Sequence, residues 1–154
     1  MIPDGQRIQI LLVEDDPDDV LLMSEVLRET RIANDLHIAM DGEEAMDFFH
    51  RRGRFPDAPV PDLVFLDLNL PKKDGRQVLT EIKADPSLRR IPVIVLTTSA
   101  AEQDVLDAYD EHVNAYVRKP LGFAALVDVF RSIEDFWLGS VLLPPRKLAG
   151  EATK

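Results

Sequence analysis

The sequence predicts an α/β fold in which five parallel strands form one doubly wound sheet with helices on both faces. Short apolar stretches alternate five times with stretches of helical periodicity, an order typical of parallel sheets joined by right-handed crossovers. The stretch 63–66 is apolar throughout, as expected for a strand that is buried on both faces. With 154 residues, 45% of them hydrophobic, the chain has the length and composition of one domain with a full-sized core.

The first strand and helix are indicated by a change from an apolar stretch to a capping signal. Residues 8–13 are almost entirely apolar and predict the strand. Asp16 is suited to cap the following helix, with Pro17 at the first helical position, where a missing N–H costs nothing. Asp18 and Asp19 are interpreted as first-turn acids that favour the helix dipole.

The second pair of elements is shorter and is followed by a long loop. Residues 36–40 predict a strand, and the turn at 41–42 leads into a helix over 43–51 with its apolar residues on one face. Residues 50–62 are rich in arginine and proline, which favours a loop that is long for a chain of alternating strands and helices.

The second half of the chain repeats the alternation with clear turn signals. Proline and glycine interrupt the periodic stretches at each boundary. The expected elements are a strand that ends at Asp67, a helix over 75–84, a strand over 92–97, a helix over 101–112, a strand over 115–118, and a last helix whose apolar face runs from Phe123 to Trp137.

Composition and charge exclude several classes of function. The chain has no cysteine, which excludes disulfides, thiol chemistry and cysteine-bound zinc. A formal net charge of −10 without a dominant basic stripe argues against direct nucleic-acid binding. Because no apolar stretch could span a membrane and the N-terminus lacks the order of a signal peptide, a cytoplasmic protein is expected.

Polar side chains stand at the ends of four predicted strands. Glu14 and Asp15 follow the first, Asp67 the third, Thr97 the fourth and Lys119 the fifth. Each alone could be a capping or surface residue, but the carboxyl ends of parallel strands meet at one edge of the sheet. Three neighbouring carboxylates need a counter-charge, which a hard cation such as Mg²⁺ would supply. An aspartate neutralised in this way could accept a phosphoryl group whose oxygens contact the hydroxyl and the ammonium.

The order and spacing of four motifs over about residues 6–137 resemble those of bacterial response regulator receiver domains. The motifs are Ile10–Asp15, Phe65–Pro71, Val95–Thr97 and Tyr116–Pro120. The resemblance implies the flavodoxin-like receiver fold, (βα)5, and a two-component signalling protein rather than an enzyme, with limited self-dephosphorylation. A histidine kinase would phosphorylate Asp67, and the face of the fourth helix, fifth strand and fifth helix would change shape to signal through protein partners or dimerisation.

The resemblance also implies a role for each residue of the site. Asp67 resembles the phosphoacceptor, Asp15 a direct Mg²⁺ ligand and Glu14 an acid that acts through water. The implied metal ligands are Glu14, Asp15, Asp67 and the backbone carbonyl of Asn69. The residues implied to contact the phosphoryl group are Thr97 and Lys119.

Two further roles concern the lifetime and the effect of the phosphoryl group. The residues expected to set its lifetime are Asn69, Thr98 and Ser99. The implied switch residues are Thr97 and Tyr116, although Tyr116 could also be a packing residue at the rim of the sheet. We further expect a cis peptide between Lys119 and Pro120, because Lys119 must turn back toward the site.

A closer resemblance is to the single-domain regulators that are paired with phytochrome-type histidine kinases. It is carried by Asp67–Arg76, Arg89–Val93, Leu96–Ser99 and the long loop before the third strand. It implies that the partner sensor kinase could be a bacteriophytochrome. Because the chain ends soon after the fifth helix, the output is expected to pass through a protein partner, a dimer or onward phosphotransfer.

Three alternatives remain open at this point. A phosphatase of the haloacid dehalogenase type would also use an aspartate at a strand end, but it needs a second aspartate where this chain has Asn69. A flavodoxin-like cofactor carrier would need a phosphate-binding loop after the first strand, where Glu14 and Asp15 would repel a phosphate. A degenerate receiver that serves only as an interaction module is disfavoured by the full set of site residues.

The C-terminal residues predict a contact surface. The domain is expected to end near residue 137, followed by an extension over 138–154 whose last part is frayed. Apolar residues that the core of the last helix does not need predict a homodimer, and folding back onto the domain is the alternative. The predicted dimer contact comprises Phe136, Leu138, Val141, Leu142 and Leu143, whereas Phe123, Val127, Phe130 and Ile133 are assigned to the core.

Overall fold

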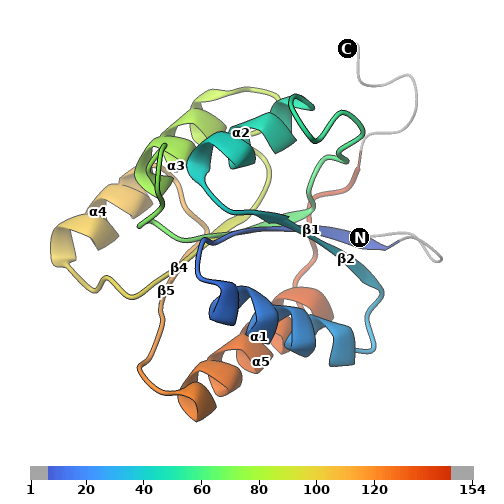
Figure 1. Cartoon of the computed structure of the whole chain (residues 1–154), viewed down its shortest axis with the longest axis vertical. Coiled ribbons are helices and arrows are strands. Elements are labelled where there is room, and N and C mark those ends of the chain that lie inside the picture. Colours follow the sequence, from blue (N-terminus) through green and yellow to red (C-terminus); the bar gives the residue numbers. More distant parts are fainter. Residues whose placement is uncertain (1–6, 147–154) are drawn as a thin grey trace.

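The computed structural model describes residues 7–146 and has one parallel sheet between two layers of helices (Figure 1). The strands lie in the order β2-β1-β3-β4-β5, and every neighbouring pair is parallel. The elements are β1 (Ile8–Val13), α1 (Pro17–Glu29), β2 (Asn34–Ala39), α2 (Gly42–His50), β3 (Leu63–Leu66), α3 (Gly75–Ala84), β4 (Val93–Thr97), α4 (Glu102–Asp110), β5 (Ala115–Arg118) and α5 (Phe123–Gly139).

The predicted fold class is confirmed, and the boundaries differ where pairing or a left-handed residue decides them. β2 begins two residues earlier than expected, because Asn34 pairs with Ile8 at the start of β1. α4 ends at Asp110, and His112, predicted to be helical, has a φ of 65°, which a helix cannot contain. The Asp16 cap is confirmed, since its carboxylate accepts a hydrogen bond from the N–H of Asp18 at 2.9 Å.

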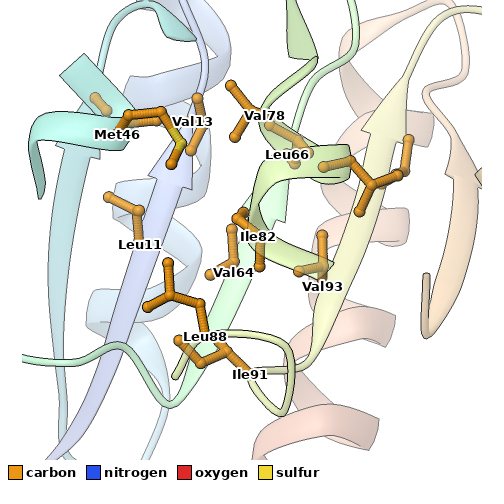
Figure 2. Close-up of a cluster of buried hydrophobic side chains, with 14 of the residues drawn as sticks. Leu11, Val13, Met46, Val64, Leu66, Val78, Ile82, Leu88, Ile91 and Val93 are labelled. Carbon is orange, nitrogen blue, oxygen red and sulfur yellow. The ribbon is translucent and has the colours of Figure 1, made fainter. Parts of the chain in front are cut away.

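The core is divided between the two faces of the sheet by the alternation of side chains along each strand. In Figure 1, α2, α3 and α4 cover one face, and α1 and α5 cover the other. On the first face, Leu11 and Val13 of β1 pack toward Val78 and Ile82 of α3 (Figure 2). The intervening residues of each strand face α1 and α5, which explains why the central strands are apolar throughout.

The C-terminal segment differs from the prediction. Leu138 and Leu143 are buried in the core between the sheet, α1 and α5, and Val141 is half-buried against it, so these three fold back onto their own domain. Phe123 is 74% exposed and is not a core residue. Phe136 is exposed, and its role as a dimer contact stays a prediction. The predicted frayed tail lies, from residue 147 onward, outside the described residues.

An ion pair holds this segment at the other end of the sheet from the predicted site. The Arg146 guanidinium donates to the Asp62 carboxylate, with Nε 3.0 Å from Oδ1. Asp62 precedes β3, is buried, and also accepts a hydrogen bond from the backbone N–H of Gln9 in β1 at 2.7 Å.

Nowhere in residues 7–146 does a helix combine the length and hydrophobicity that crossing a membrane would require.

The turn after β3 places α3 directly against Asp67. The N–H of Gly75 donates to the carbonyl of Leu68 at 3.0 Å, and a Cβ at Gly75 would lie 2.1 Å from the carbonyl oxygen of Asp67. A glycine is therefore required at this position by a close approach of two backbones. Any larger residue must displace either α3 or the loop over residues 67–74, hereafter the Asp67 loop.

We expect Gly75→Ala to destabilise the protein by roughly 1–3 kcal/mol, the cost of overpacking a well-packed site. Urea denaturation followed by circular dichroism measures this effect. Gly139→Ala is the matched control, because it is also helical but the nearest atom to its Cβ would be 3.9 Å away. Equal unfolding midpoints for the two variants would contradict the prediction.

Candidate functional site

Four polar residues that sequence analysis assigned to one edge of the sheet are brought together in the structure. Glu14 follows β1, Asp67 follows β3, Thr97 ends β4 and Lys119 follows β5. All four are buried, which is rare for charged residues without partners. Asp15 lies beside them and is exposed. The parallel order of the strands thus gathers residues that are up to 105 positions apart.

Lys119 lies at the centre of the site and contacts three carboxylates. Its Nζ donates hydrogen bonds to Glu14, to Asp19 at 2.8 Å and to Asp67 at 3.4 Å. Asp19 was interpreted from sequence only as an acid of the first helical turn, so its contact with Lys119 was missed. The signal that could have revealed it is geometric: the first turn of α1 starts at the same edge, and helical side chains point toward the N-terminus of their helix.

Burial shifts the protonation of this cluster. Burial raises the pKa of the Glu14 carboxyl to about 8; the hydrogen bond from Lys119 opposes the shift, and neighbouring Asp67 adds to it. Burial lowers the pKa of the Lys119 ammonium, but hydrogen bonds to Asp19 and Glu14 outweigh this effect and hold the pKa above its ordinary value. The site therefore keeps its ammonium charged and retains a proton on a carboxyl at neutral pH.

The predicted metal ligands form a suitable donor set. One carboxylate oxygen from each of Glu14, Asp15 and Asp67 lies within 4.8 Å of the others. Clustered carboxylate oxygens that are partly open to solvent suit a hard divalent cation. The Asn69 N–H donates to Oδ1 of Asp67 at 3.1 Å. The role of the Asn69 carbonyl as a further ligand stays a prediction.

The residues at the end of β4 have different surroundings. Oγ1 of Thr97 accepts long hydrogen bonds, both 3.5 Å, from the Asn69 side-chain amide and from the Ser99 N–H. Thr98 is exposed, so its effect on phosphoryl lifetime stays a prediction. The Ser99 hydroxyl donates to Asp104 at 2.6 Å, which turns it toward α4, and its effect on phosphoryl lifetime also stays a prediction.

Tyr116 is oriented toward the interior. Its ring is half-buried against the core on the α2–α3 side of the sheet, and its hydroxyl donates to the carbonyl of Ser99 at 2.9 Å. Burial raises the pKa of its hydroxyl, so the phenol stays protonated. The residue thus contacts both the core and the β4–α4 loop, a position that fits the predicted switch role.

The predicted cis peptide between Lys119 and Pro120 is wrong, since none of the peptide bonds among residues 7–146 is cis. The N–H of Lys119 donates to the carbonyl of Thr97 at 2.7 Å, which continues the pairing of β4 with β5. This pairing already aims Lys119 at the site, and the intrinsically preferred trans form is retained. The chain turns two residues after Pro120, at Gly122, whose φ is 97°.

Comparisons with known proteins agree with this geometry. A family model described as the response regulator receiver domain matches residues 10–131. The chain is 50% identical to the response regulator Rcp1 of Synechocystis sp. over an alignment of 135 residues. This alignment covers 88% of this chain and 92% of Rcp1. It is similar to the solved Mn(2+)-bound form of Rcp1, with 49% identity, a TM-score of 0.87, and coverage of 90% of this chain and 99% of that one. It is also similar to the phosphorylated cyanobacterial phytochrome response regulator RcpA, with 45% identity, a TM-score of 0.87, and coverage of 91% and 100%.

We expect Mg²⁺ binding at this site to release a proton. With a pKa of about 8 in the folded, metal-free protein, Glu14 is protonated below that pH, whereas a cation binds the ionised form. The apparent affinity should therefore rise from about pH 6 to pH 8 and then level off. Calorimetric titration at neutral pH in two buffers of different ionisation enthalpy measures the released proton. Glu14→Gln is the control that should release none, and identical heats for the unmodified chain in both buffers would contradict the assignment.

Proposed function

The chain belongs to the response regulator receiver domain family, and we propose that it acts as a phosphorylation-controlled switch in which a histidine kinase phosphorylates Asp67. The observation that carries the proposal is the position of Asp67, buried at the carboxyl edge with Lys119 and two further acids around it. A cytoplasmic location is part of the proposal, because a kinase has its ATP there.

The proposed chemistry is transfer of a phosphoryl group from a phosphohistidine to a carboxylate. A carboxylate oxygen of Asp67 forms a bond to phosphorus, the P–N bond breaks, and the imidazole leaves with its electron pair. Glu14, Asp15 and Asp67 would hold Mg²⁺, which neutralises the charge of the phosphoryl oxygens. Lys119 and the hydroxyl proton of Thr97 would contact those oxygens, since both hydrogen bonds of the Thr97 hydroxyl among the described residues use Oγ1 as an acceptor.

The proposed switch follows from redistribution of charge. A phosphoryl group on Asp67 adds negative charge beside Lys119, which already binds three carboxylates, and draws its ammonium toward the new oxygens. Thr97 would move in the same direction, releasing the loop that it shares with Ser99 and Tyr116. A local charge change would thereby alter the face formed by α4, β5 and α5, through which the protein signals to partners.

We further propose that the partner is a phytochrome-type histidine kinase. The support is the 45% identity to RcpA, a phytochrome response regulator, over 91% of this chain. The net charge of −10 argues against nucleic acid as a direct partner. A haloacid dehalogenase-type phosphatase is disfavoured, because Asn69 stands where the general acid is needed and an amide cannot supply an acidic proton.

We expect Asp67 to be the single phosphorylation site. Incubation with acetyl phosphate and Mg²⁺, followed by intact-mass spectrometry, should add one phosphoryl group to the unmodified chain. Asp67→Asn and addition of EDTA should each abolish the adduct, since one removes the nucleophile and the other the cation. A persistent adduct in Asp67→Asn would assign the nucleophile to another residue.

The proposal includes a homodimer, with a smaller contact than the sequence predicted. Leu138 and Leu143 are buried within one chain, which leaves Phe136 and Leu142, 57% and 77% exposed, available to a second copy. Phe136 borders a shallow groove of about 400 Å³ between β5 and α5, lined mainly by apolar residues including Trp137. Exposed apolar residues near the end of α5 and just after it suit a two-fold contact that depends on phosphorylation.

We expect Phe136→Ser combined with Leu142→Ser to convert the dimer to a monomer, because both exposed contacts are lost. Light scattering at micromolar concentration, with and without acetyl phosphate, measures the mass. Val60→Ser is the control, since Val60 is equally exposed, at 57%, but lies in the loop before β3. A monomeric unmodified chain in both states would refute the dimer.

A further inference from the structure

A second polar cluster connects the loop after Asp67 with α4. Arg76 lies in the first turn of α3, and its guanidinium binds Asp104 of α4 with two hydrogen bonds, of 3.1 and 2.8 Å. The same group donates to the Asp74 carboxylate at 3.2 Å and, more weakly, to the Leu68 carbonyl at 3.5 Å. Arg76 therefore bridges the residue that follows Asp67 and the start of another helix.

The contacts continue from α4 to Tyr116. Asp104 accepts a hydrogen bond from the Ser99 hydroxyl at 2.6 Å, on the same oxygen that binds Arg76 at 2.8 Å. Ser99 in turn accepts the Tyr116 hydroxyl on its carbonyl at 2.9 Å, and its N–H reaches Thr97 at 3.5 Å. Two routes thus lead from the Asp67 loop to Tyr116, one through Thr97 and the other through Arg76 and Asp104.

The second route matters because α4 is held by few apolar contacts. Ala108 is its only buried residue, and its N-cap, Ala101, has no side chain that could accept a capping hydrogen bond. Leu106 and Tyr109 of α4 are about half exposed, at 52% and 51%. With so little core packing, the orientation of the first turn of α4 depends on polar contacts, of which the forked pair with Arg76 is directional.

The stability of the fold does not explain this pair. The side chains of Arg76 and Asp104 are 39% and 20% exposed, and ion pairs that are partly open to solvent typically contribute little to the free energy of unfolding. An arginine that binds a carboxylate through two parallel hydrogen bonds fixes orientation more than it adds free energy. The structure therefore indicates a role in positioning.

We propose that Arg76 is a positioning residue that couples Asp67 to Tyr116, by fixing the first turn of α4 and the Ser99 carbonyl relative to the loop after β3. The inference rests on the proposed function, since it concerns how a change at Asp67 reaches the switch face. Displacement of the Asp67 loop on phosphorylation would pull Arg76, and with it Asp104 and the acceptor of the Tyr116 hydroxyl.

Fluorine NMR on protein labelled with 3-fluorotyrosine tests the coupling, because the chain has only two tyrosines. Tyr109→Phe assigns the Tyr116 resonance. The resonance is recorded before and after saturation with Mg²⁺ and beryllium fluoride, an analogue of the aspartyl phosphate. The variants are Arg76→Gln, Asp104→Asn and the pair together. Glu81→Gln is the matched control, because it removes another exposed ion pair of α3, with Lys73 at 2.6 Å, that does not reach α4.

We expect beryllium fluoride to shift the Tyr116 resonance of the unmodified chain and of Glu81→Gln equally. The shift should fall to less than half in Arg76→Gln and in Asp104→Asn, and the double variant should lose no more than either single one, because the two residues act in one route. A full shift in Arg76→Gln, or an equal loss in Glu81→Gln, would overturn the inference while leaving the proposed function intact. An unmodified chain that takes up neither acetyl phosphate nor beryllium fluoride would overturn both.

Discussion

The buried ammonium group of Lys119 contacts three acidic side chains, and the properties of the site depend on this excess of acidic groups over basic ones. Lys119 binds Glu14, Asp19 and Asp67, while Asp15 lies just outside. Burial strengthens each interaction and also penalises every charge that is left without a partner. Burial, with a smaller contribution from neighbouring Asp67, raises the pKa of Glu14 and so reduces the negative charge of the site, and a divalent cation would offset what remains. A phosphoryl group added to Asp67 would therefore change the partners of Lys119.

The fold accommodates this charged cluster because it keeps the cluster apart from the apolar core. Both faces of the sheet are filled with apolar side chains, so the polar groups are confined to the ends of the strands. The lysine is aimed by backbone pairing, since the Lys119 N–H binds the Thr97 carbonyl. The loop that contains Asp67 packs against the start of α3, where Gly75 allows the backbones of the loop and the helix to approach closely. The side chains of the site thus rest on rigid strands, and the loops beyond them are free to respond.

The sequence predicted the strands, their order along the chain and the residues at the edge, because those features depend on local patterns and on one general property of parallel sheets. It could not predict contacts that depend on the relative placement of helices. Asp19 looks like any first-turn acid until α1 is placed beside Lys119, and Arg76 looks like a surface residue until α4 is placed beside α3. Leu143 was predicted to be a dimer contact but is buried in its own domain. Its burial depends on the direction that the chain takes after the last helix, which local sequence patterns do not determine.

The two sides of the sheet are held in different ways, and this determines where a change at Asp67 can travel. On one face, α1 and α5 share a core that the C-terminal segment extends, and Arg146 attaches that segment to buried Asp62. On the opposite face, α4 buries only Ala108 and has half-exposed apolar residues. Regions with few buried apolar contacts have the smallest local free energies of opening. A displacement that begins at Asp67 therefore meets less resistance toward α4 and Tyr116 than toward α1, and polar contacts with directional geometry decide which of the possible movements is selected.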